Sequence, residues 1–192
     1  MFKNKNFITL LMAFGQIQGV LITLAATANE ATAKFGFTSN DASMLGALFI
    51  VGGLVGATGF GIYVEKTKKY KRSLNLLCIS STVFTGLNFF FLPMGKAWLI
   101  SLVSFFQGAF MVPTIALSID LGVELTYPIG ESFSTGVLLN SGQLWGIFYT
   151  LIASYVIDHT DSTGTKIAYL GYASACFIGF IFSLFIKEKL LR

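Results

Sequence analysis

The segment that decides the fold is the basic stretch Gly61-Ile-Tyr-Val-Glu65-Lys66-Thr-Lys68-Lys69-Tyr-Lys71-Arg72, which separates two long apolar runs. The run before it covers about residues 41–64, and the run after it covers about residues 73–92. A helix needs about 20 apolar residues to cross the hydrocarbon core of a bilayer. Both runs meet that length, so the sequence predicts two membrane-spanning helices joined by a short, positively charged turn.

The same pattern extends over the whole chain of 192 residues, of which 54% are hydrophobic and 11% are charged. A soluble domain carries about 25% charged residues, so this composition argues against one. The other apolar runs cover about residues 7–28, 97–121, 132–157 and 166–186. The sequence therefore predicts an all-α integral membrane protein, residues 1–192, folded as a single six-transmembrane-helix bundle.

Basic residues gather on one side of the predicted bundle, and short loops rich in Lys and Arg stay on the cytoplasmic side of a membrane. We therefore expect both termini in the cytoplasm or its equivalent, with the protein in the plasma membrane or an organelle membrane. The clustering also favours the lipid bilayer over nucleic acid as a partner. The side with both termini carries Lys3, Lys5, Lys66, Lys68, Lys69, Lys71, Arg72, Lys187, Lys189 and Arg192, and the other carries Lys34, Lys96 and Lys166.

The first 28 residues also resemble a secretory signal peptide, with Lys3 and Lys5 before an apolar run that ends at Ala26-Thr-Ala28. A signal-peptide core has about 7–15 apolar residues, and this run is longer. It also contains Gln16 and Gln18 near its middle. These features favour a first transmembrane helix.

Glycines four residues apart occur in three of the predicted spans. Small residues let membrane helices approach closely, so we expect tight helix packing at these positions and assign them no substrate role. The pairs are Gly15 and Gly19, Gly52 and Gly56, and Gly142 and Gly146.

The stretch from Gly61 to Arg72 resembles the signature Gly-x-x-x-Asp-Arg/Lys-x-Gly-Arg/Lys-Arg/Lys of the major facilitator superfamily. That signature lies between the second and third helices of each six-helix half, which is its place here. Glu65 stands where the signature has Asp, and Lys68 stands where it has Gly. Composition alone would also allow a plain basic loop.

A second stretch, Val123-Glu-Leu-Thr-Tyr-Pro128, is similar to the carboxy-terminal half of the feline leukaemia virus subgroup C receptor-related transporters, solute carrier family 49. The likeness extends from Gly15 to Lys187. It implies one half of a major facilitator superfamily fold, namely the last six helices of a twelve-helix transporter. The expected partners are a small-molecule substrate and a second six-helix half, from the same chain, a homodimer or another subunit. Substrate would bind between the halves, near the membrane midplane.

Polar side chains inside the predicted spans are candidates for substrate binding, because burying them in lipid is costly. The resemblance implies that Gln143 contacts substrate, and Asn140 lies one helical turn before it on the same side. The alternative for Gln143 is an ordinary interhelical hydrogen bond. Gln107 and Gln16 are further candidates, which packing partners would explain equally well. The family's cation-binding tyrosine aligns with Ile22, which puts choline in doubt, and we interpret Trp145 as a packing or lipid-facing residue.

Charged residues near the cytoplasmic ends of the spans suggest a conformational latch. A carboxylate at a helix end can hold basic groups in one state and release them when the bundle rocks. Asp120 and Glu124, spaced i and i+4, would also suit proton coupling. The expected latch residues are Gly61, Glu65, Lys66, Lys69, Asp120 and Glu124.

Catalysis is not expected, because the sequence has no nucleophile beside a base and no metal-ligand cluster. The single His159 lies in a loop, and Cys78 and Cys176 lie in apolar runs, so we expect no metal and no cofactor. The leading hypothesis is a secondary transporter, half-length or truncated, that moves a choline-like or ethanolamine-like amine, or haem, by alternating access. Haem would need an axial ligand that His159 is badly placed to supply. The alternative is a non-transporting six-helix structural subunit of a larger membrane complex.

Overall fold

The computed structural model describes residues 4–160 and 162–186, and these residues form six long α-helices and no strand. Lys3, Lys187, Lys189 and Arg192, which were counted for the charge bias, lie outside the described residues. The all-α bundle predicted from the sequence is confirmed. The helices are α1 (Lys5–Ala33), α2 (Ser39–Thr67), α3 (Tyr70–Phe91), α4 (Ala97–Thr126), α5 (Glu131–His159) and α6 (Ser162–Phe185), with a short 3₁₀ turn η1 (Leu92–Met94) after α3.

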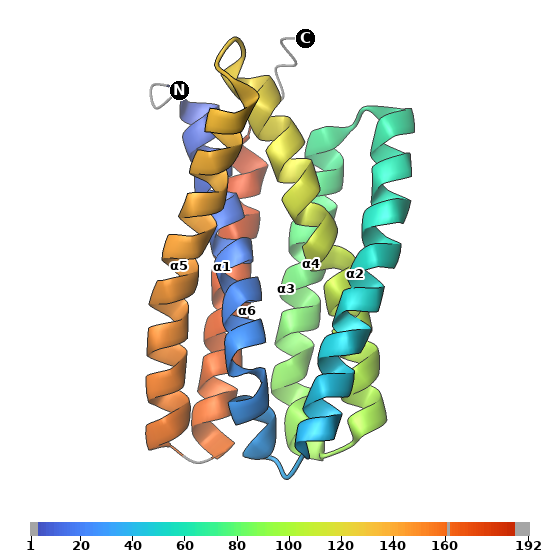
Figure 1. Ribbon diagram of the computed structural model, residues 1–192, viewed down its shortest axis with the longest axis vertical. Coiled ribbons are helices and arrows are strands. Elements are labelled where there is room, and N and C mark those ends of the chain that lie inside the picture. The colour runs from blue at the N-terminus through green and yellow to red at the C-terminus, as the bar shows by residue number, and fades with distance from the viewer. Residues whose placement is uncertain (1–3, 161, 187–192) are drawn as a thin grey trace.

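Consecutive helices run in opposite directions (Figure 1). The start of α1, the end of α6, and the α2–α3 and α4–α5 connections lie at one end of the bundle, here named the near end (Figure 1). The other three connections lie at the opposite, far end. The basic segment 66–72 therefore lies at the same end of the bundle as the start of α1 and the end of α6. The cytoplasmic location of this near end stays a prediction.

The helices extend a few residues beyond the apolar runs. The apolar run expected to end at residue 121 belongs to a helix that ends at Thr126, and the run expected to end at residue 28 belongs to a helix that ends at Ala33. A helix satisfies its own backbone groups, so it does not need to stop where the lipid does.

Capping groups mark where α2 begins and ends. At its start, the Thr38 side chain accepts from the Asp41 backbone N–H while the Asp41 carboxylate accepts from the Thr38 N–H, a reciprocal capping box. At its end, Lys68 has a left-handed backbone with φ 53°. Left-handed residues that close helices are usually glycine. Lys68 occupies the position where the transporter signature has Gly, so this turn explains in physical terms why the signature favours Gly there.

The closest helix contact joins α2 to α4, and it depends on glycine. A Cβ added to Gly52 would collide with the carbonyl oxygen of Phe105, and one added to Gly56 would collide with that of Ala109. On the facing helix, a Cβ on Gly108 would meet the carbonyl oxygen of Phe49. Both members of the predicted Gly52 and Gly56 pair therefore serve close packing of two backbones.

A related contact joins α5 to α1. Trp145 of α5 lies against Gly15 and Gly19, and Ile22 of α1 lies against Gly146. The two contacts correspond, since α2 packs on α4 as α5 packs on α1, and α3 and α6 pack against each other. The first three helices and the last three thus form two similar units that run in opposite directions.

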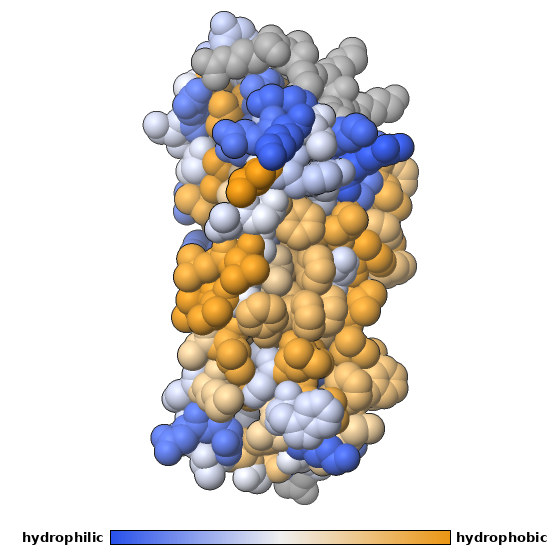
Figure 2. Space-filling model, turned by 90° about the vertical axis from the view of Figure 1, so that its right-hand side faces the viewer, coloured by the Kyte–Doolittle hydropathy of each residue, from blue (hydrophilic) through white to orange (hydrophobic). Residues whose placement is uncertain are grey.

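The surface carries an apolar band between two hydrophilic ends (Figure 2). Among the described residues, five helices are long and apolar enough to cross a membrane: α1, α2, α3 with η1, α4 and α6. The helix that does not meet this measure is α5, which has 29 residues and lies beside α1. Its lower apolarity reflects polar side chains such as Asn140 and Gln143 in its middle.

We predict that Gly56→Ala destabilises the bundle, because the added Cβ forces α2 away from α4. Overpacking of this kind costs about 1–3 kcal/mol. Gly59→Ala is the matched control, since nothing lies within 4 Å of its added Cβ. That control should gain roughly 0.5–1 kcal/mol from the better helix former. Thermal unfolding of both variants in detergent measures the difference, and equal stabilities would contradict the glycine contact.

We also predict that Lys68→Gly stabilises the end of α2, because a left-handed conformation costs a non-glycine residue about 1–2 kcal/mol. Lys69→Gly is the control, since Lys69 has φ −95°. The control should give no gain, because its backbone already suits an L-residue. Denaturation midpoints of the two variants separate these outcomes, and a gain at Lys69 with none at Lys68 would refute the explanation.

Candidate functional site

A cavity of about 420 Å³ opens between α1 and α2 in the far half of the bundle. Its walls include Leu21 and Leu24 from α1 and Leu45 and Phe49 from α2. The connection between these two helices has only the five residues 34–38, yet they make few contacts with each other, so the space between them stays open. The volume falls in the range of about 300–1,000 Å³ that is typical of small-molecule sites.

The floor of this cavity is an amide network between α3 and α4. The Asn88 side-chain nitrogen donates to Gln107 Oε1 at 3.0 Å, and Gln107 Nε2 donates to Thr85 Oγ1 at 3.0 Å. Asn88 also donates to the Phe84 carbonyl oxygen at 3.1 Å. Asn88 is 3% exposed and Gln107 is 4% exposed, so both amides are held away from lipid. Hydrogen bonds inside the bundle offset the cost of burying them.

Of the predicted substrate-binding residues, only Gln107 lines this cavity. Gln16 is buried between α1 and α5, where its side-chain oxygen accepts a hydrogen bond from the Tyr149 hydroxyl. The structure therefore gives Gln16 an interhelical partner and separates it from Gln107. Its neighbour Gln18 lies against Gly142, and the side-chain oxygen of Gln18 is enclosed without a hydrogen-bond partner.

Gln143 and Asn140 are exposed on one face of α5. Neither amide has a hydrogen-bond partner in the part of the chain that the structure describes. Their neighbours Leu144 and Ile147 are 69% and 59% exposed. The two amides thus lie side by side on an otherwise apolar surface, apart from the cavity that contains Gln107.

Three of the predicted latch residues lie together on α2 and α4, close to the near end of the bundle. Gly61, Glu65 and Asp120 line one pocket of about 100 Å³, together with Tyr70 from the start of α3. Lys66 is exposed on the solvent side of α2. Two carboxylates facing one small space form a negative site that would attract a basic side chain.

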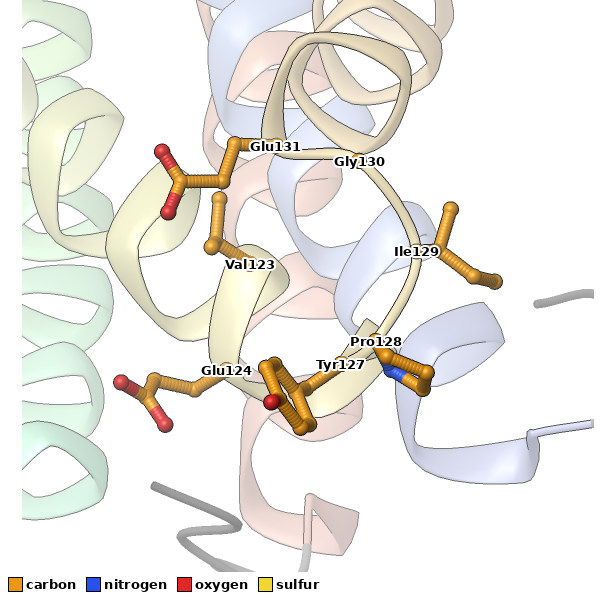
Figure 3. Close-up of a pocket in the computed structure, with 7 residues that line it drawn as sticks. All are labelled: Val123, Glu124, Tyr127, Pro128, Ile129, Gly130 and Glu131. Atoms are coloured by element: carbon orange, nitrogen blue, oxygen red, sulfur yellow. The ribbon is translucent and has the colours of Figure 1, made fainter.

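Glu124 lies in a different pocket, of about 210 Å³, formed by the loop between α4 and α5. Figure 3 shows Glu124 and Glu131 extending to the same side of this loop, with the Tyr127 ring beside Glu124. One carboxylate oxygen of Glu124, Oε2, is enclosed and has no hydrogen-bond partner. Asp120 and Glu124, although spaced as i and i+4, thus border two separate pockets.

The sequence interpretation missed Asn88, which forms the centre of the amide network. Asn88 lies inside the apolar run 73–92, and a polar amide in such a run is a functional or packing candidate. The rule that identified Gln107 would therefore have found Asn88 as well. Tyr169 of α6, which also borders the cavity, gave no such signal because tyrosine is common in membrane helices.

Metal chemistry has little support in the described ranges, where no group of three or more His, Cys, Asp or Glu residues could hold a metal ion. Cys78 and Cys176 are buried and unpaired in the helix core. His159 is exposed, stacks on Tyr155, and makes a hydrogen bond only with the backbone of its own helix among described residues.

The architecture defines a multi-pass α-helical membrane protein. Its two oppositely directed sets of three helices are the arrangement found within each half of a major facilitator superfamily transporter. Comparison with known proteins then identifies the family.

Curated relatives match the chain over most of its length. The zebrafish (Danio rerio) choline/ethanolamine transporter flvcr2a is 33% identical over 190 residues, which are 98% of this chain and 40% of the relative. The human (Homo sapiens) choline/ethanolamine transporter FLVCR2 is 29% identical over 193 residues, 100% of this chain and 36% of the relative. Solute carrier family 49 member A3 of Xenopus tropicalis is 30% identical over 151 residues, 78% of this chain and 31% of the relative. No family model matches the chain.

The chain belongs to the feline leukaemia virus subgroup C receptor-related family, solute carrier family 49. It spans 40% or less of the length of these relatives. The resemblance noted in the sequence is therefore confirmed, as is the assignment to multi-pass membrane proteins of the solute carrier group.

We predict that Gln107→Leu destabilises the bundle by about 1–3 kcal/mol, because it leaves the buried Asn88 amide without its acceptor. The double variant Asn88→Leu with Gln107→Leu should be more stable than the sum of the two single changes implies, with a coupling of about 0.5–3 kcal/mol. Unfolding of the three variants in detergent measures this coupling. Additive effects would show that the two amides do not interact.

Proposed function

We propose that this chain forms one half of a secondary transporter for a small organic solute. The observation that carries the proposal is the exposed pair of amides, Gln143 and Asn140, on an apolar face of α5. Polar groups facing lipid are costly, and in membrane bundles they face a partner or an aqueous cavity instead. A second six-helix half against this face would supply both, with the solute bound between the halves.

The proposed solute is a choline-like or ethanolamine-like amine, in line with the names of the relatives. Gln143 would offer its side-chain oxygen or nitrogen to the hydroxyl that both solutes carry. Binding of a quaternary ammonium also needs aromatic faces. Trp145 lies against Gly15 and Gly19, and Ile22 stands at the position of the family's tyrosine, so we assign the aromatic faces to the second half.

Alternating access would use the negative pocket at Glu65 and Asp120 as its latch. In one state a basic group of the second half would enter this pocket, and in the other state it would leave. Lys66 and Lys69 are exposed at the same end and would contact acidic groups of that half. The latch therefore rests on two carboxylates held together by the close contact of α2 with α4.

The test is uptake of labelled choline and ethanolamine by cells that lack their own uptake. The chain is expressed alone and fused behind the first six helices of the human relative FLVCR2. We expect uptake from the fusion and none from the chain alone, because a single half supplies one wall of the site. A fusion that reaches the membrane folded, yet takes up neither solute, would overturn the proposal and favour a structural role.

In the active fusion, Gln143→Ala should lower uptake about two- to tenfold, as expected when a neutral hydrogen bond of about 0.5–1.5 kcal/mol is lost. Its thermal stability should hardly change, because Gln143 is exposed. Trp145→Ala is the contrasting variant: it removes packing against two glycines and should lower stability more than uptake per folded molecule. Unchanged uptake in Gln143→Ala would remove this residue from the site.

A further inference from the structure

The cavity between α1 and α2 contains no charged side chain among the described residues that line it. A cationic solute would find no carboxylate there, and an anionic one would find no basic group. Its walls are mostly aliphatic. Besides the polar groups of the floor, Asn29, Thr32 and Ser43 line it closer to the α1–α2 connection. No residue of α5 lines this cavity, so it is separate from the α5 face assigned above to an amine.

The floor keeps hydrogen-bonding capacity that the protein does not use. Asn88 commits both amide hydrogens, to Gln107 and to the Phe84 carbonyl, which leaves its oxygen as a free acceptor. Gln107 commits one amide hydrogen to Thr85, which leaves one free donor. Both residues line the cavity and are more than nine-tenths buried.

Two hydroxyl groups add to this unused capacity. Ser104 and Tyr169 also line the cavity and are 9% and 7% exposed. Neither hydroxyl forms a hydrogen bond within the part of the chain that the structure describes. Four buried residues from α3, α4 and α6 thus converge on one uncharged space with free donors and acceptors.

We propose that this cavity binds an uncharged lipid with a single hydroxyl head group, such as a sterol, with Asn88 and Gln107 as the groups that recognise the hydroxyl. One hydroxyl can donate to the free Asn88 oxygen and accept from the free Gln107 N–H. The aliphatic body then lies along Leu21, Leu24 and Leu45. Ile50 at the cavity edge is 63% exposed, so the cavity opens to the surface of the bundle there.

Photolabelling tests this proposal without requiring transport. The full chain is reconstituted in phosphatidylcholine vesicles that contain a diazirine-bearing sterol, and the labelled peptides are identified by mass spectrometry. We expect label on α1 and α2 around the cavity, displaced by unlabelled sterol and not by choline. Displacement by choline alone would overturn the proposal, since it would place a cation in the cavity.

A matched pair of glycine variants tests whether the sterol binds in this cavity. Gly46 lines the cavity and has nothing within 4 Å of an added Cβ, so Gly46→Leu adds a side chain at the cavity without a clash at its Cβ. Gly59 lies on the same helix, is equally open, and borders no part of this cavity. Labelling should fall about tenfold in Gly46→Leu and stay unchanged in Gly59→Leu. Equal labelling of the two variants would refute the site.

A second pair tests the recognising group. Asn88→Leu removes the free acceptor and should reduce labelling as strongly as Gly46→Leu. Asn75→Leu is its control, because Asn75 lies on the same helix, has an unpartnered side-chain oxygen, and does not line the cavity. If Asn88→Leu proves unstable, the Gly46→Leu result decides alone. Full labelling of a folded Asn88→Leu variant would exclude hydroxyl recognition by this amide.

Discussion

The close backbone contact of α2 with α4 is the interaction on which the rest of the structure depends. In a bilayer the hydrophobic effect does not drive helices together, so dispersion contacts between closely packed surfaces must do so. Gly52 and Gly56 on α2 and Gly108 on α4 allow this approach. The contact sets the direction of α2. At the far end, this direction leaves the cavity open beside α1. At the near end, it brings Glu65 and Asp120 to the same pocket.

A second constraint decides which polar side chains are structural. Several amides and hydroxyls inside the bundle are paired across helices: Asn88 with Gln107, Tyr149 with Gln16, and Thr27 with Tyr172 at 3.1 Å. Gln143 has no such partner and lies on the surface. The same amide chemistry thus occurs both inside the bundle and on its surface, and its position relative to neighbouring helices separates the two cases.

The sequence predicted the helices well because apolar length and charged turns are local properties. It predicted the ends less well, since α4 continues to Thr126 beyond its apolar run. The left-handed Lys68 was visible only as a departure from the Gly of the transporter signature. Pairing could not be predicted, because Gln16 and Gln107 looked alike in the sequence. Gln16 pairs with Tyr149 from a helix distant in the chain, whereas Gln107 pairs with residues of the preceding helix α3 and also borders a cavity.

The pockets at the two ends of the bundle differ in charge. At the near end, Glu65 and Asp120 share one pocket and Glu124 and Glu131 share another, so carboxylates border both spaces. At the far end, the cavity above Asn88 and Gln107 is uncharged. Charged pockets respond strongly to an approaching basic group, whereas a neutral cavity responds to shape and hydrogen bonding. Under the proposed alternating access, one half would respond to charge at one end and to a neutral ligand at the other. The helices α2, α3 and α4 connect the two sites, because each of them lines both the Glu65 pocket and the far-end cavity.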